Sequence, residues 1–219
     1  MKKVIACMLA LCLILALAGC GGTDQTADSG DCSDNAGETL KVSPLASDID
    51  VNAITDADLA ASFDAASLHT EGDTMTLDVK VYDFVKYDAA EVAQLKVGDT
   101  IVADGQDMVI TSIEDGNGYT INGGYEQGGL SLASLEGGLL YAYGADDAKS
   151  YYEVGTVTLP LSTGCKLLDS SDPVGDEIKV TTADLAAFLA EDTVTFRPGS
   201  TTVTVAGGQI TGITRVYMP

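Results

Sequence analysis

The sequence predicts a mainly β protein, in which antiparallel hairpins form a small barrel or sandwich with two short helices. From residue 40 onward, short apolar segments are separated by Gly, Asp and Asn, which is the spacing of strands and turns. Segment 74–84 places Leu77, Val79 and Val81 at every second position, as in a strand with one buried face. Hydrophobic residues make up 46% of the 219-residue chain, so a folded core is expected.

Two segments predict the short helices. Asp88 and Glu91 have the spacing of a capping box, and Gly98 is placed to end the helix that follows. Thr182 is predicted to cap a second helix over 183–190, where apolar residues recur at helical spacing.

The remaining segments predict strands joined by glycine-containing turns. Gly105, Gly118 and Gly207 lie at positions where hairpins with native twist need a positive backbone angle. The strands expected around these turns lie at 100–103, 108–113, 119–122, 201–205 and 210–217. Further strands are expected at 154–161, with Pro160 pushing this one toward a sheet edge, at 167–169 before a turn that ends at Pro173, at 193–196 and, weakly, within 58–68.

The amino terminus has the layout of an export signal. Lys2 and Lys3 precede an uncharged stretch over 4–18 that is shorter than the roughly 20 apolar residues of a membrane-spanning helix. The following Leu17-Ala18-Gly19-Cys20 resembles the lipobox of bacterial lipoproteins. This resemblance implies that the signal peptide 1–19 is removed and that the Cys20 sulfur carries a diacylglyceryl group, a palmitate-type lipid anchor. The protein is then expected on the extracytoplasmic side of the cell membrane, or on the outer membrane if the organism has one.

The region after the anchor is polar and acidic. Residues 20–39 offer almost no apolar surface to offset the entropy cost of ordering, so they predict a disordered tether. Residues 40–219 form the β domain. The similar motifs at Gly98 and Gly199 leave open whether it is one domain or two small β modules.

The charge of the chain restricts its partners. The formal net charge is −22, and it becomes −24 once Lys2 and Lys3 leave with the signal. A surface this negative repels phosphate backbones, so a nucleic-acid partner is not expected. No cofactor is predicted, although weak nonspecific calcium association fits an acidic surface.

A catalytic set is not evident in the sequence. Ser162-Thr-Gly-Cys165 partly resembles the Ser-His-Gly-Cys signature of L,D-transpeptidases, but Thr163 replaces the histidine and Leu167 replaces the arginine. A thiol needs a neighbouring base to act as a nucleophile, so Cys165 is predicted to be structural. His69, the single histidine, is interpreted as an exposed loop residue. The adjacent Asp146 and Asp147 are interpreted as a solvated loop.

Two further features of the sequence bear on metal and disulfide chemistry. The run from Asp115 to Glu126 has the length of a calcium-binding loop, but Tyr119 and Thr120 occupy positions that need an oxygen ligand and a glycine. No metal site is therefore predicted. A disulfide between Cys32 and Cys165 stays open, since these are the two cysteines left after export and acylation.

The strongest binding signal is a group of four tyrosines, namely Tyr141, Tyr143, Tyr151 and Tyr152. Rings with polar tips are frequent at surfaces that contact sugars or protein partners. The sequence therefore predicts a noncatalytic, membrane-anchored binding or envelope-associated module, with membrane lipid and a cell-wall polymer or protein as partners. The alternatives are a secreted cell-wall hydrolase or transpeptidase that uses Cys165 or a carboxylate pair, and the solute-binding lipoprotein of a transporter.

Overall fold

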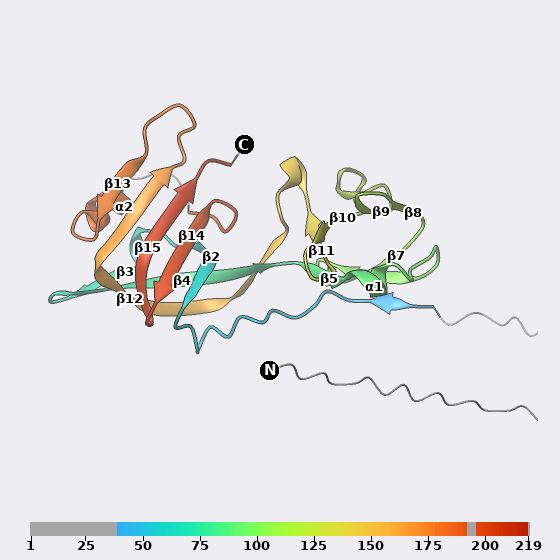
Figure 1. Cartoon of the computed structure of the whole chain (residues 1–219), viewed down its shortest axis with the longest axis horizontal. Coiled ribbons are helices and arrows are strands. Elements are labelled where there is room, and N and C mark those ends of the chain that lie inside the picture. Colours follow the sequence, from blue (N-terminus) through green and yellow to red (C-terminus); the bar gives the residue numbers. More distant parts are fainter. Residues whose placement is uncertain (1–38, 192–195, 219) are drawn as a thin grey trace, which may run out of the picture. The chain divides into compact units, whose positions relative to one another are not determined.

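The computed structural model describes residues 39–191 and 196–218 (Figure 1). Within these ranges the chain is mainly β and contains a closed five-stranded barrel and two short helices, which confirms the predicted fold class. The predicted signal peptide, the tether through residue 38 and most of the strand expected at 193–196 lie outside the described residues. Among the helices that are described, none has the length and apolar character needed to cross a membrane.

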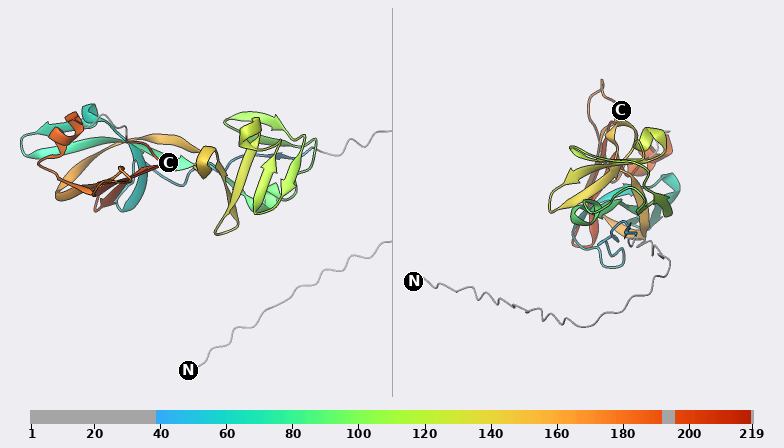
Figure 2. Two further views of the ribbon diagram at one scale, coloured as in Figure 1. Left: turned by 90° about the horizontal axis from the view of Figure 1, so that it is seen from above. Right: turned by 90° about the vertical axis from the view of Figure 1, so that its right-hand side faces the viewer.

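The barrel closes because one strand pairs at both ends of a sheet. Its strand order is β12-β15-β14-β2-β4, and β4 pairs again with β12 (Figure 2). The strands are β2 (Ala57–Ser62), β4 (Thr74–Phe84), β12 (Tyr151–Ser170), β14 (Thr201–Ala206) and β15 (Gln209–Val216). Two short strands extend the sheet outside the closed part, β3 (Leu68–Glu71) beside β4 and β13 (Ile178–Thr181) beside β12.

Strand β12 is far longer than the sequence predicts. It runs for 20 residues, whereas the sequence suggested two separate strands, one over 154–161 and one at 167–169 that leads into a turn. Its first half, Tyr151–Pro160, pairs antiparallel with β4, and its second half pairs parallel with β15 after a shift in register between Leu161 and Lys166. Among the named pairings, the stretch that contains Pro160 pairs with β4 alone, so the proline ring, which has no N–H to donate, fits at an edge.

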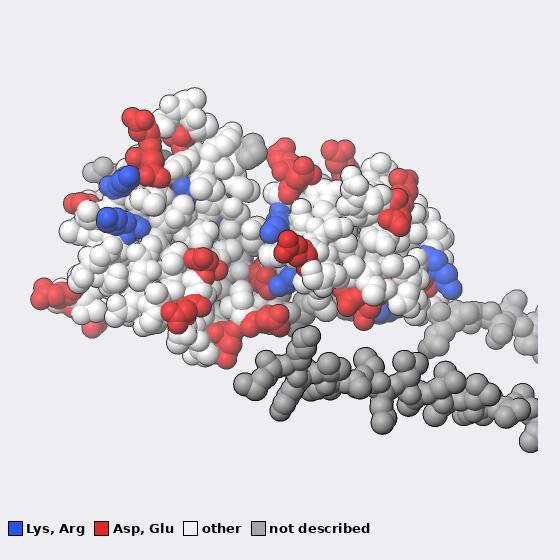
Figure 3. Space-filling view, in the orientation of Figure 1, with Lys and Arg blue, Asp and Glu red and all other residues white. Residues whose placement is uncertain are grey.

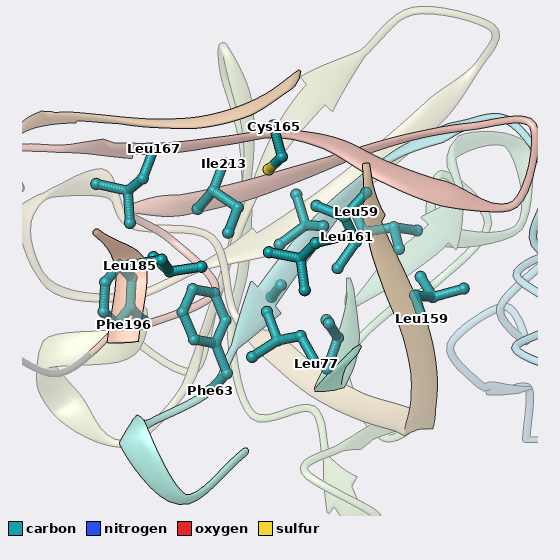
Figure 4. Close-up of a cluster of buried hydrophobic side chains, with 14 of the residues drawn as sticks. Leu59, Phe63, Leu77, Leu159, Leu161, Cys165, Leu167, Leu185, Phe196 and Ile213 are labelled. Atoms are coloured by element: carbon teal, nitrogen blue, oxygen red, sulfur yellow. The ribbon is translucent and has the colours of Figure 1, made fainter. Parts of the chain in front are cut away.

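The barrel is filled by aliphatic and aromatic side chains from every one of its strands (Figure 4). The rings of Phe63 and Phe196 stack with centroids 4.3 Å apart. Helix α2 (Leu185–Glu191), near the position of the predicted second helix, adds two leucines. The most deeply buried members are Leu59, Ala61, Leu77, Val79, Val81, Leu167, Leu185, Val203, Ile210 and Ile213.

A buried ion pair joins β12 to β15 inside this core. Asp169 and Arg215 are register partners in the two strands, and each side chain is only 4% exposed. The Arg215 guanidinium donates to both carboxylate oxygens, at 3.0 Å from Nε and 2.5 Å from Nη2, and it lies 4.8 Å from the centroid of the Phe196 ring. Burial raises the pKa of Asp169, but the hydrogen bonds from Arg215 and Ser171 outweigh it and hold the pKa below its usual value of 3.8.

A second hydrophobic cluster lies between two smaller sheets. The five-stranded sheet has the order β5-β11-β10-β9-β8, and the three-stranded sheet has the order β1-β6-β7. Their strands are β1 (Lys41–Val42), β5 (Lys86–Asp88), β6 (Thr100–Ala103), β7 (Gln106–Val109), β8 (Ile113–Asp115), β9 (Gly118–Ile121), β10 (Leu130–Leu135) and β11 (Leu139–Tyr143). The cluster includes Tyr87, Val92, Ile101, Ile110, Ile121, Leu132 and Leu140.

Two aspartates fix the local structure around this second cluster. Asp88 caps the predicted first helix, α1 (Ala89–Val92), by accepting hydrogen bonds from the Ala90 and Glu91 N–H groups. The helix ends at Val92, well before Gly98, and is therefore shorter than expected. Asp99, fully buried, accepts hydrogen bonds from the Leu40 and Lys96 N–H groups, both at 2.9 Å. The backbone hydrogen bond from Leu40 is the main cause of its lowered pKa.

Two details of the sheets differ from the hairpin pattern. The strands expected at 100–103 and 119–122 are close to β6 and β9, but the single strand expected at 108–113 is wrong, because β7 ends at Val109 and β8 begins at Ile113 in a different sheet. In addition, β1 pairs with β6 and β12 pairs with β15 in parallel. Hairpin signals report only on strands adjacent in sequence, so they contain no information on these pairings.

We expect replacement of Arg215 by alanine to destabilise the fold strongly. The variant leaves the Asp169 carboxylate buried without its partner, which costs about 3–5 kcal/mol in the free energy of unfolding. The matched control is Lys179→Ala, since Lys179 pairs with Glu177 at an exposed site and should change the free energy by less than about 0.5 kcal/mol. Urea titration measures both values, and equal small losses in the two variants would contradict a structural role for the buried pair.

Candidate functional site

A polar row crosses one face of the five-stranded sheet. Tyr143 in β11 is the register partner of Ser131 in β10, which pairs with Thr120 in β9, which pairs with Glu114 in β8. Side chains directly opposite each other on paired strands point to the same face. The neighbouring residues along these strands, among them Leu132, belong to the hydrophobic cluster on the other face. The row therefore lies on the face of the sheet away from this cluster, with Ser131 buried and Thr120 and Tyr143 half-buried.

A glycine-rich loop places a further tyrosine beside this row. The loop between β9 and β10 contains the short 3₁₀ turn η2 (Tyr125–Gln127), and the Tyr125 N–H donates to the Ser131 hydroxyl at 3.0 Å. The Tyr125 ring lies against Gly144, where an added Cβ would come within 3.3 Å of it. The Tyr125 side chain is nevertheless 53% exposed, so the ring is held in place and still open to solvent.

Three hollows adjoin this row, and Tyr143 lines all of them. Their volumes are about 570, 320 and 190 Å³, and the first is within the range of small-molecule sites. The first two also share Tyr125 and Ser131, and the second and third share Thr120. We call these three neighbouring hollows, which have Tyr143 in common, the Tyr143 groove.

The walls of the groove combine apolar and acidic side chains. The first hollow has an apolar lining that includes Val85, Tyr87, Met108 and Leu130. Carboxylates occur in every hollow, and the described lining contains no Lys, Arg or His. These carboxylates are Asp104, Asp107, Glu114, Asp115, Glu126, Asp146 and Asp147.

An aromatic cluster continues from the groove toward the barrel strands. Tyr143 contacts Tyr141 at 6.2 Å between ring centroids, and the Phe84 ring lies edge-on to Tyr141 and to Tyr151, in each case at 6.3 Å. The Lys149 ammonium lies 4.1 Å from the Phe84 centroid and 5.4 Å from that of Tyr141. The structure thus brings Tyr141, Tyr143 and Tyr151 into one aromatic cluster, and the Lys149 ammonium contacts Phe84 and Tyr141 within it.

The fourth predicted tyrosine is placed differently. Tyr152 follows Tyr151 in β12, so its side chain points to the opposite side of the strand. Its hydroxyl is buried and has no hydrogen-bond partner among the described residues.

The phenol of Tyr151 stays neutral near pH 7, because burial, together with the nearby Asp83 carboxylate, raises its pKa.

The single histidine does not form a nucleophile triad. The His69 Nε2 atom lies 2.8 Å from the Asp78 carboxylate, and the Thr158 hydroxyl donates to the same carboxylate at 2.6 Å. The carboxylate is thus in the middle, whereas an activated hydroxyl must contact the imidazole. The hydrogen bonds from Thr158 and His69 lower the pKa of Asp78. His69 lies in strand β3, on the rim of a surface hollow, and not in the loop that the sequence suggested.

Cys165 belongs to the barrel core. Its side chain is 3% exposed, its sulfur points into the cluster in Figure 4, and it forms no disulfide with any described residue. Burial raises the pKa of this thiol to about 11, so the thiolate is scarce at neutral pH. The disulfide with Cys32 stays a prediction, because Cys32 lies outside the described residues. The acylation site Cys20 lies outside them as well.

The start of the calcium-loop-like run at Asp115 and the Asp146–Asp147 pair both lie in turns. Asp115–Gly118 is the turn between β8 and β9, closed by a hydrogen bond from the Gly116 N–H to the Gly118 carbonyl. Asp146 and Asp147 are exposed in the 3₁₀ turn η3 (Ala145–Asp147), at the rim of the groove, with φ of 54° and 57°. Within the described part of the chain, no three His, Cys, Asp or Glu side chains are arranged to hold a metal ion.

Several groove residues were missed by the sequence analysis. Tyr125 was not singled out, although glycine pairs at 123–124 and 128–129 flank it and are typical of a loop that presents a side chain. Ser131 and Thr120 have no sequence signal of their own, since only the register of three strands brings them beside Tyr143. Phe84 and Lys149 join the tyrosines for the same reason.

Comparison with known proteins gives no family for this chain: no family model, no curated protein and no solved structure matches it.

We expect Cys165 to resist thiol reagents in the folded protein. Its burial and raised pKa leave almost no accessible thiolate, so labelling should require opening of the barrel and should be far slower than labelling of the unfolded chain at the same pH. Peptide mass spectrometry that reads Cys165 alone measures the rate, with the urea-unfolded chain as the control. Labelling of the native protein as fast as that of the unfolded chain would contradict this account and support Cys165 as a nucleophile.

Proposed function

We propose that this protein is a surface lipoprotein, anchored to the membrane through acylated Cys20, whose folded part is a noncatalytic binding module. The observation that carries the binding function is the Tyr143 groove, in which three hollows share one tyrosine at the end of β11. The groove continues into an aromatic cluster. Half-buried tyrosines beside concave, polar-rimmed surface are the usual composition of recognition sites.

The anchor proposal rests on the sequence. Each buried methylene of an acyl chain contributes about 0.8 kcal/mol, so a diacylglyceryl group holds a protein at a bilayer for a long time. Residues 20–39 between the anchor and the β domain reach at most roughly 70 Å when fully extended. An acidic tether favours extension by self-repulsion, which lets the groove contact partners above the lipid surface.

The chemistry of the described residues favours binding over catalysis. Cys165 lacks both the accessibility and the base that a transpeptidase nucleophile needs. The adjacent Asp146 and Asp147 are both exposed, so their environments do not separate an acid from a base as hydrolysis requires. A transporter receptor of the usual kind has two α/β lobes, and the mainly β fold does not fit that plan.

We expect Tyr125→Ala and Tyr143→Ala to weaken binding by about tenfold or more, since truncation of a central aromatic residue typically costs at least that. The probes are short oligolysine peptides and oligomers of N-acetylglucosamine, titrated into the full-length acylated protein in detergent micelles. The matched control is Tyr217→Ala, because Tyr217 is similarly exposed, at 49%, and does not line the groove. If neither probe binds, or if all three variants behave alike, the groove is not the binding site.

A further inference from the structure

We propose that the Tyr143 groove takes a cationic polypeptide segment, bound through lysine or arginine side chains in an extended conformation. This inference rests on the binding function proposed above and names its ligand class. It follows from the charge of the groove, from its apolar walls, and from the way the protein already accommodates one of its own lysines.

The charged side chains among the described residues that line the groove are all acidic. Seven carboxylates line its three hollows, and none of the described lining residues is basic. Lys41 pairs with Asp107 at 2.8 Å, and the other six form no ion pair with any described residue. Figure 3 shows that acidic side chains predominate over lysine and arginine on the face in view, with basic side chains beside acidic ones in places. Such a surface attracts cationic ligands and speeds their encounter.

The apolar walls fit the stems of lysine and arginine. The largest hollow is lined by Val85, Met108 and Leu130, with Asp104 and Asp107 exposed at its rim. A lysine or arginine side chain has an aliphatic stem that buries against apolar surface and a charged head that stays near carboxylates and water. A small inorganic cation would leave these apolar walls without a partner.

The neighbouring aromatic cluster shows that this surface accepts an ammonium group. The Lys149 ammonium lies over the Phe84 ring at 4.1 Å and near the Tyr141 ring at 5.4 Å. Both distances are within the roughly 6 Å at which a cation is attracted to the face of an aromatic ring. Tyr143, which contacts Tyr141, extends the same aromatic surface into the groove.

The shape of the site favours an extended segment. The polar row from Tyr143 to Glu114 crosses four paired strands, and neighbouring strands are about 4.8 Å apart, so the row is roughly 14 Å long. That length matches about four residues of extended polypeptide, which place alternate side chains on the same side at about 7 Å spacing. Two basic side chains can then reach carboxylates in adjacent hollows.

A short fluorescent oligolysine peptide tests this ligand class with the full-length acylated protein in detergent micelles. Anisotropy titration should show binding that weakens as salt is raised, and binding should be lost when the lysines are acetylated. The groove variant combines Glu126→Gln with Asp147→Asn. The control variant combines Asp73→Asn with Asp176→Asn, which removes the same charge at exposed positions outside the groove.

We expect the groove variant to weaken oligolysine binding by roughly fivefold or more, and the control variant by less than about twofold. Equal weakening in both would overturn the proposal, because it would mean attraction to the overall negative charge only. If a neutral N-acetylglucosamine oligomer binds, loses affinity on Tyr125→Ala, and the oligolysine does not bind, the ligand class is wrong while the binding function stands. If neither probe binds, the proposed function fails as well.

Discussion

The double pairing of β12 is the constraint on which the rest of the structure depends. Its first half completes the barrel against β4, and its second half pairs with β15 and β13. The buried pair of Asp169 and Arg215 fixes the register of the second half, since a shift by one residue would move a charge out of its partner's reach and reverse the faces of the strand. A single strand therefore determines both the closure of the barrel and the position of Tyr151 at its start.

The same pairing assembles the aromatic end of the groove. Phe84 and Tyr151 are register partners at the end of β4 and the start of β12, so they share a face of the ribbon. Lys149, just before β12, contacts the Phe84 and Tyr141 rings, and the Tyr141 ring contacts the Tyr143 ring. Phe84 and Tyr151 belong to barrel strands, whereas Tyr141 and Tyr143 belong to the five-stranded sheet, so the aromatic cluster combines residues of both sheets.

The sequence predicted elements whose signals are local. The strand 74–84, the Asp88 cap and the C-terminal hairpin were each indicated by residues next to one another, and each is present. The length of β12 was missed because Gly155, Pro160 and Gly164 suggest interruptions, whereas the strand tolerates them at an unpaired edge and a register shift. Clustering of Tyr141, Tyr143 and Tyr151 was predictable from their proximity in sequence. The groove was not, because it depends on long-range register.

The groove belongs to the described fold, whereas the proposed lipid anchor rests on the amino-terminal sequence alone. The central claim is that acylation of Cys20 keeps this groove at the cell surface. Mass spectrometry of the amino-terminal peptide, taken from protein purified from membranes, tests this claim most directly. The account predicts a chain that begins at Cys20 and carries the mass of a diacylglyceryl group on its sulfur. A chain that retains Met1, unmodified and recovered from the soluble interior of the cell, would contradict it.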